Sequence, residues 1–155
     1  FCIGHSTTTN LSYTGFMLGS VRCAEETDHT PAAAQLDSLT ASCECVLQPV
    51  RNYFGMVVRI SSGLRVPELN SAIGGSTTSD HCKGMAADIE VPGVDNLALA
   101  EWVVKNLEFR QVILEFYTPG IPDSGWVHVS YNPSDNKKQA LTATKKDGKT
   151  VYLLG

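Results

Sequence analysis

The stretch QVILEFYTPGIPDSGWVHVSY, residues 111–131, contains two runs of strand-forming residues separated by a loop. Residues 111–117 are rich in aliphatic and aromatic side chains, and residues 126–131 alternate with the two-residue period of a strand. Pro119-Gly120 and Pro122-Asp123, which lie between the two runs, are typical of turns. We therefore expect the runs to pair as an antiparallel hairpin.

Four other segments have the composition of strands. Asp147-Gly148 carries the strongest short hairpin signal in the chain, because this dipeptide suits a tight turn between two strands. An apolar run upstream predicts a buried strand, followed by a turn at residues 61–63. The four predicted strands are residues 56–60, 86–91, 140–144 and 150–154.

Three helices are expected. Thr30-Pro31 is a favourable helix start, and apolar residues then recur at helical spacing from Leu36 to Phe54, before Gly55. Pro49 lies inside this run and is expected to kink the helix or shorten its last turn. A second, short helix opens at Pro67 and closes at Gly74-Gly75, and a third is capped by Asp95 or Asn96. The core face predicted for the third helix is Leu97, Ala100, Trp102, Val103 and Leu107.

Helices followed by clustered adjacent strands are typical of an α+β domain. We expect a single domain with a mostly antiparallel sheet and helices packed on one side of it, which leaves the other face open. The 155 residues, of which 43% are hydrophobic, suffice for one core. Residues 1–30, rich in Thr, Ser and Gly, predict an irregular N-terminal arm ahead of a domain at residues 31–155.

Charge and hydropathy limit the partners of the chain. A formal net charge of −4 argues against nucleic-acid binding, which normally needs a basic face. No apolar run approaches the roughly 20 residues of a membrane span, and no signal peptide is visible. The C-terminal lysines are expected to form a solvated surface: Lys137, Lys138, Lys145, Lys146 and Lys149.

The five cysteines include no Cys-x-x-Cys pair, so a structural zinc ribbon is not expected. We interpret most of them as reduced, which fits synthesis in the cytoplasm, while a disulfide between Cys2 and Cys23 stays open.

Two of the four histidines bring other chemical groups with them, whereas His5 and His29 are interpreted as surface residues. His81 lies in a loop, and Asp88 lies on the strand that follows. Gly84 and the small side chains between them allow the loop to fold back on the strand, so an imidazole and a carboxylate can reach one point. That pair suits a tetrahedral zinc site, and the alternative is a plain hydrogen bond between the two.

His128 offers a third ligand. Strand alternation places Trp126, His128 and Ser130 on one face. Three protein ligands leave one position for water, as in catalytic zinc sites. Zinc lowers the pKa of such a water to roughly 7, so that it can attack an amide carbonyl.

Glu115 is the first candidate for the general base. If the hairpin is symmetric about residues 121–122, Glu115 falls opposite His128, with β-carbons ~5 Å apart. Its neighbours along the strand are apolar. Because a charged group among apolar side chains is costly unless it is paired, a functional role would explain the presence of this carboxylate. Asp123, in the loop before His128, is the alternative base, and Glu90 is a third candidate.

A cation is also expected at the site. Arg65 follows a strand and a tight turn, so its guanidinium can clamp a carboxylate or a developing oxyanion at the end of the sheet. Arg59, within the strand, is the competing choice.

Three segments together resemble a known family. They are SDHCKGMAAD (79–88), ISSGLRVPELN (60–70) and WVHVS (126–130). The first is similar to the Ser-x-His-x-x-Gly-x-Ala-x-Asp signature of the zinc D-alanyl-D-alanine carboxypeptidase family. That family includes peptidoglycan carboxypeptidases, vancomycin-resistance dipeptidases and many phage endolysins, and shares its fold with the hedgehog signalling domain. The resemblance covers about residues 32–131 and is greatest to the short phage-type members.

The resemblance implies one Zn²⁺ ion held by His81, Asp88 and His128, a substrate- or oxyanion-binding role for Arg65, and support of the site by Ser79. Trp126, beside the third ligand, is a candidate substrate contact. Two positions depart from the family pattern: Leu64 replaces a usual aromatic residue, and Gly125 stands where many members carry a Glu or His.

The function that the resemblance implies is hydrolysis of peptidoglycan stem peptides, as a carboxypeptidase or as an endolysin-type endopeptidase. We expect a monomer that is made in the cytoplasm, acts on the cell wall and is of phage type. The alternative is a non-catalytic, zinc-stabilised binding module. Cys82 as a nucleophile paired with His81 is disfavoured, because adjacent side chains rarely aim at one another.

Overall fold

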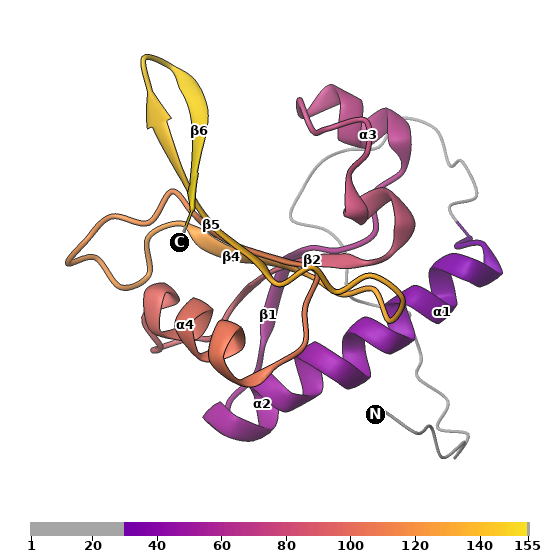
Figure 1. The fold of residues 1–155 in the computed structure, drawn as a ribbon, viewed down its shortest axis with the longest axis horizontal. Helices are drawn as coiled ribbons and strands as arrows, with labels where there is room; N and C mark the ends of the chain where they lie inside the picture. Colours follow the sequence, from indigo (N-terminus) through magenta and orange to yellow (C-terminus); the bar gives the residue numbers. More distant parts are fainter. Residues whose placement is uncertain (1–29, 155) are drawn as a thin grey trace. The chain divides into compact units, whose positions relative to one another are not determined.

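The computed structural model describes residues 30–154, which include one compact unit that begins at Pro31 (Figure 1). The predictions for His5, for His29, for the N-terminal arm and for a Cys2–Cys23 disulfide lie outside the described residues.

A six-stranded sheet organises this unit, in the order β1-β2-β4-β3-β5-β6. All neighbouring strands are antiparallel except β3 and β5, which are parallel. The α+β prediction with a mostly antiparallel sheet is therefore confirmed. The strands are β1 (Arg59–Ser62), β2 (Ala86–Glu90), β3 (Gln111–Glu115), β4 (Trp126–Ser130), β5 (Gln139–Lys146) and β6 (Lys149–Leu154).

Three of the four α-helices described cover one face of the sheet. Figure 1 shows α1, α2 and α4 on one side and the short α3 on the other. Apolar residues of β2, β3 and β4 that point toward α2 and α4 form the core with Val50, Leu99 and Val103. The helices are α1 (Ala33–Ser42), α2 (Gln48–Phe54), α3 (Pro67–Ala72) and α4 (Asn96–Asn106).

The first predicted helix is continuous but irregular. A π-helical turn, Cys43–Leu47, joins α1 to α2, and in it the Gln48 N–H donates to the carbonyl of Cys43, five residues earlier. Pro49 follows at once. Proline has no N–H to donate, and its ring clashes with the carbonyl four residues before it, so a local widening of the helix accommodates it. The helix begins slightly later than Pro31 and ends at Gly55 in a left-handed conformation, as glycine favours.

The prediction for residues 56–60 was wrong in burial and extent. Strand β1 begins at Arg59, includes Ser61 and Ser62, and is mostly exposed, because it is the edge of the sheet. A break in register between Ile60 and Ser62 replaces the expected turn. Val58 packs against the core instead.

The core face of α4 differs from the prediction at Leu97, which is 38% exposed, while Leu99 is fully buried. The buried Asn96 explains this rotation: its side-chain amide donates to the carbonyls of Ser124 and Gly125, both at 3.2 Å. Asp95 caps the helix by accepting the N–H of Leu97 at 2.8 Å.

The C-terminal hairpin is confirmed. β5 and β6 pair up to Lys146 and Lys149, and Asp147 (φ 51°) and Gly148 (φ 75°) both adopt the left-handed conformation of a type I′ turn. No helix among residues 30–154 is both long and apolar enough to cross a bilayer.

Candidate metal centre

His81, Asp88 and His128 come from three different elements. Asp88 on β2 and His128 on β4 are directly paired, so both side chains leave the open face of the sheet at one point. His81 lies in a short 3₁₀ turn, Asp80–Lys83, that returns over this face. The turn ends at Gly84, at φ 72°, where a β-carbon would lie 2.8 Å from the carbonyl oxygen of Gln35. Only glycine fits that path, as the sequence indicated.

The three side chains converge on one point and are almost fully buried. His81 Nε2 lies 3.2 Å from Asp88 Oδ1 and 3.1 Å from His128 Nδ1, and the latter two atoms are 2.9 Å apart. A tetrahedral zinc ion with bonds of about 2.0–2.1 Å separates its ligand atoms by about 3.3 Å. The observed triangle has nearly that size, so this donor set fits zinc. Among the described residues, no other group of three His, Cys, Asp or Glu side chains lies close enough together to hold an ion.

Outer contacts orient the candidate ligands. The Nδ1 of His81 lies 2.8 Å from the Gly63 carbonyl, which can only accept, so Nδ1 carries the proton and Nε2 offers its lone pair to the centre. Burial raises the pKa of Asp88, but the neighbouring imidazoles of His128 and His81 outweigh this effect, and the pKa is held well below its ordinary value. The carboxylate is therefore charged across the usual pH range.

Arg65, which lies in the loop after β1, contacts a candidate ligand. Its Nη2 donates to Asp88 Oδ2 at 2.5 Å, and its Nε donates to the hydroxyl of Ser62 at 2.7 Å. Its charge is therefore balanced by Asp88. This pairing could not be predicted from the sequence, because it depends on how distant strands align.

Glu115 lies on the same face of the sheet as His128, but in a different register from the one predicted. Ile113, not Glu115, is opposite His128, and Glu115 pairs with Trp126. The hairpin is shifted by two residues because Gly125, at φ 66°, packs directly on the carbonyl of Glu115. A shift of two preserves the face, so Glu115 lines the same cavity as the three candidate ligands, one diagonal step from His128.

Burial raises the pKa of Glu115 and the negative charge of Asp88 adds to this, while the nearby His128 acts in the opposite direction; the net shift is upward. A half-buried carboxyl with a raised pKa is a candidate for proton transfer.

The other acidic candidates lie elsewhere. Asp123 is exposed and lines a separate hollow that also contains Arg59 and Glu90. Arg59 and Glu90 form an ion pair at 3.6 Å. The structure does not bring any of these three residues into the cavity of the candidate ligands.

Ser79 and Trp126 both line that cavity. The Ser79 hydroxyl accepts the backbone N–H of His81 at 3.3 Å, so it supports the turn that carries this histidine. The Trp126 ring meets Phe116 edge to face at 5.3 Å, and its buried Nε1–H has no hydrogen-bond partner among the described residues. An aromatic wall therefore adjoins the candidate ligands.

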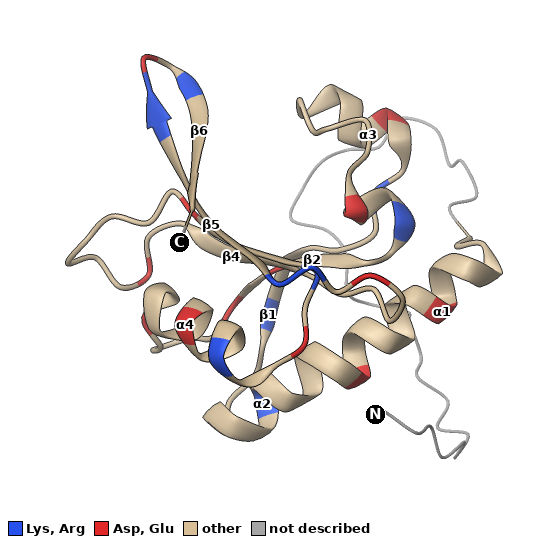
Figure 2. Ribbon diagram, in the orientation of Figure 1, with Lys and Arg blue, Asp and Glu red and all other residues tan. Residues whose placement is uncertain are grey.

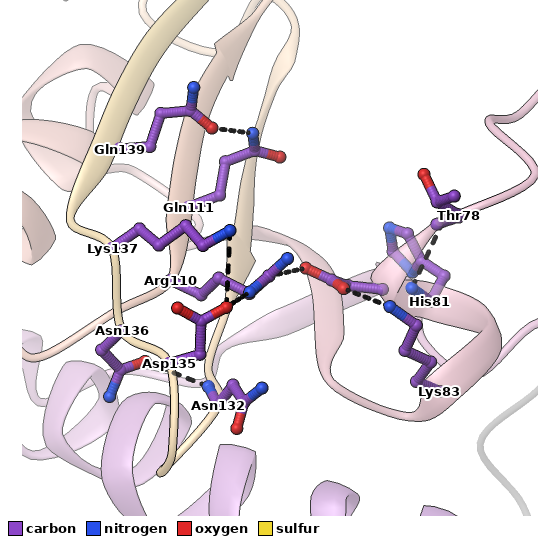
Figure 3. A network of polar contacts seen from close by, with 12 residues as sticks. Thr78, His81, Lys83, Arg110, Gln111, Asn132, Asp135, Asn136, Lys137 and Gln139 are labelled. Carbon is purple, nitrogen blue, oxygen red and sulfur yellow. Dashed lines mark hydrogen bonds and ion pairs between the residues drawn. The ribbon is translucent and has the colours of Figure 1, made fainter.

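The sequence reasoning missed a polar network at the other side of the cavity. Figure 3 shows Arg110 and Lys137 both directed at Asp135. Arg110 Nε also donates to Asp80 at 2.9 Å, which ties β3 to the turn carrying His81. The only feature of the sequence that could have pointed to this network is the position of Asp80 directly before His81.

The cavity itself has a volume of about 940 Å³ and extends from α3 to the β5–β6 hairpin. Its floor holds the three candidate ligands and Glu115. The C-terminal lysines are exposed, as expected, but Lys137 and Lys145 also line this cavity.

Comparison with known proteins agrees with the site. The sequence model of the family described as peptidase M15 matches residues 9–130, which include all three candidate ligands and Glu115. The match begins nearer the N-terminus than the motifs that carried the resemblance. No protein among curated sequences matches the chain. Because the match spans most of the 155 residues, this chain belongs to the peptidase M15 family.

Proposed function

We propose that this peptidase is a zinc enzyme that hydrolyses peptide bonds in the stem peptides of bacterial peptidoglycan, with the cell wall as its site of action. The observation that carries the proposal is the convergence of His81 Nε2, Asp88 Oδ1 and His128 Nδ1 at one buried point on the floor of a cavity that also contains Glu115. Family membership supports a peptidase, and the donor set supports zinc.

In this proposal His81, Asp88 and His128 hold one Zn²⁺ ion. When bound, zinc acts as a Lewis acid and lowers the pKa of a water molecule to roughly 7. Arg65 holds the second oxygen of Asp88, which leaves the first oxygen directed at the two imidazoles. We therefore assign Arg65 a positioning role.

Glu115 is the proposed general base and acid. Its carboxylate takes the proton of the attacking water and then gives it to the leaving nitrogen. The raised pKa of Glu115 agrees with this double role, because it makes the carboxylate a stronger base than an ordinary glutamate. Trp126 supplies an apolar surface for the substrate beside this carboxylate.

We favour an endopeptidase over a carboxypeptidase. A carboxypeptidase needs a cation close to the metal to bind the terminal carboxylate of its substrate. Among the described residues, Arg65 is the cation next to the candidate ligands, and Asp88 already balances its charge. The cavity, with a volume of about 940 Å³, has room for several residues of peptide.

Mass spectrometry of defined muropeptides, incubated with zinc-loaded protein with and without a chelator, tests the function. We expect internal cleavage products that the chelator abolishes. Glu115→Gln and Glu115→Ala should retain zinc yet lose about 10²–10⁴-fold in kcat. Release of D-alanine alone would favour the carboxypeptidase.

Two results would contradict the proposal. Zinc-bound wild-type protein that releases no product would favour a non-catalytic binding module. Wild-type activity in both Glu115 variants would remove Glu115 from the mechanism.

A further inference from the structure

The β5–β6 hairpin forms one wall of the cavity, and it lies beyond residue 130, where the family match ends. Register places Glu115 beside Ala143 of β5, and Ala143 beside Tyr152 of β6. Directly paired residues point to the same face, so Glu115 and Tyr152 flank a small alanine. Burial and the negative charge of Glu115 both raise the pKa of Tyr152, which agrees with their closeness. The hairpin therefore contributes to the same site as Glu115.

Four cations line the cavity among the described residues, and three of them are in ion pairs. Arg65 is paired with Asp88, and Arg110 and Lys137 both contact Asp135. Lys145 has no acidic partner within the described part of the chain. It is thus the cavity cation whose charge is left for a ligand.

Neutral groups hold Lys145 in place. Its ammonium donates to the hydroxyl of Thr150 at 2.9 Å and lies 5.1 Å from the centre of the Phe116 ring. Phe116 in turn meets Trp126 edge to face. These contacts direct the ammonium along the aromatic wall of the cavity, and they leave its charge unbalanced. Figure 2 shows basic residues on both strands of the hairpin, and of these Lys145 lines the cavity.

The sheet register fixes the distance of Lys145 from the candidate ligands. His128 is level with Ile113 and Leu141, and Lys145 is four residues further along β5 than Leu141. Side chains on one face of a strand recur roughly every 7 Å, and strands are roughly 5 Å apart. The Lys145 ammonium contacts the ring of Phe116, which directly follows Glu115 at the end of the strand paired with the one that carries His128. The ammonium therefore lies about 10–15 Å from the ligands. That separation equals about three to four residues of extended peptide.

We propose that Lys145 binds a carboxylate of the peptide substrate about three to four residues away from the cleaved bond, and thereby selects peptides that carry a free carboxylate at that place. The inference rests on the proposed peptidase function, and it assigns the hairpin wall as a substrate subsite. Because Lys145 is exposed, the interaction is partly screened by solvent, and we expect a preference of about fivefold over a neutral peptide.

Two synthetic stem peptides test this subsite. They are identical except for one carboxyl group, free in one and converted to a carboxamide in the other, three or four residues from the bond that mass spectrometry identifies. We expect zinc-loaded wild-type protein to favour the free carboxylate in kcat/KM at low salt. Lys145→Gln should lose the preference, Lys145→Arg should retain it, and 1 M salt should weaken it.

Lys146→Gln is the matched control. Lys146 is the next residue on β5, is exposed and does not line the cavity, so its variant should keep the wild-type preference. Equal preference in wild-type and Lys145→Gln protein would overturn the subsite.

Calorimetric binding of both uncleaved peptides to zinc-loaded Glu115→Gln protein, with and without Lys145→Gln, separates the subsite from the chemistry. A charge preference in binding that Lys145→Gln removes would support the subsite even if wild-type protein cleaved neither peptide. That result would count against the peptidase proposal alone. Equal binding of the two peptides would count against the subsite alone.

Discussion

The Nδ1 atom of His128 forms one corner of the buried triangle, where it contacts both Asp88 and His81. Removal of this ring leaves two protein ligands, and two ligands bind zinc far more weakly than three. We therefore expect His128→Ala to lose zinc, as measured by metal analysis after dialysis against a weak chelator.

Ser130→Ala is the control for this variant. Ser130 is the next residue of β4 on the same face, and it is fully buried. Because its hydroxyl has no hydrogen-bond partner among the described residues, its loss should be nearly neutral. The control should retain one zinc ion. Full zinc retention in His128→Ala would exclude the three-ligand site.

The raised pKa of Glu115 has a cost in stability. Burial, the first cause of the shift, favours the protonated form of the folded protein. Well below the ordinary pKa of 4.5 the carboxyl group is protonated in both the folded and the unfolded states, so its ionisation does not change the free energy of unfolding. As the pH rises through 4.5 and the folded-state pKa, ionisation favours the unfolded state.

We therefore expect Glu115→Gln to stabilise the metal-free protein at pH 7 and to have no effect below pH 4. The gain should be less than about 1 kcal/mol, because part of the carboxylate faces solvent. Urea denaturation of chelator-treated protein across this pH range measures the difference. If the stability gain of Glu115→Gln instead increased toward low pH, the pKa of Glu115 would be lowered rather than raised in the folded protein, which would contradict the prediction.

Among the elements, the β3–β4 connection decides where Glu115 lies. A β-carbon on Gly125 would lie within 1.9 Å of the Glu115 carbonyl oxygen, and Gly125 has φ 66°. Gly120, in the same connection, has φ 86° but open space around it. Substitution of Gly120 therefore tests backbone strain alone, whereas substitution of Gly125 adds the steric clash.

We predict that Gly120→Ala costs about 1–2 kcal/mol through strain, and that Gly125→Ala costs about 1–3 kcal/mol more through overpacking. Gly125→Ala should also lower activity, because the shift in backbone moves Glu115. Urea denaturation and the muropeptide assay provide both readouts. Similar losses of stability in the two variants would show that the β3–β4 connection adjusts to a side chain at Gly125 and does not define the strand register.

At the scale of the whole molecule, the metal proposal predicts that zinc ties the sheet to the turn that carries His81. Any ligand that binds only the folded state stabilises it by mass action, by about 4 kcal/mol at 1,000 times its Kd. We expect saturating zinc to raise the melting temperature by roughly 10 °C over chelated protein. Differential scanning calorimetry measures the shift, which His128→Ala should abolish. An equal shift in that variant would place the zinc elsewhere.

Alternation in residues 126–130 correctly indicated that Trp126, His128 and Ser130 share a face, because a strand has a fixed two-residue period. Asp147-Gly148 predicted its turn for an equally local reason: its backbone conformation is a property of those two residues. The prediction that Leu97 belongs to the core face of α4 was wrong, because contacts between Asn96 and a distant loop set the rotation of that helix.

The sequence by itself determined the α+β class, most of the elements and the three residues proposed to hold the metal, because these depend on periodicity, turn chemistry and a short motif. Only the tertiary structure decided the pairing of Arg65 with Asp88, the register that moves Glu115 opposite Trp126, and the place of Lys145 in the cavity wall. Each of these depends on how strands far apart in the chain align. Register is fixed by packing across the whole sheet, which no local pattern encodes.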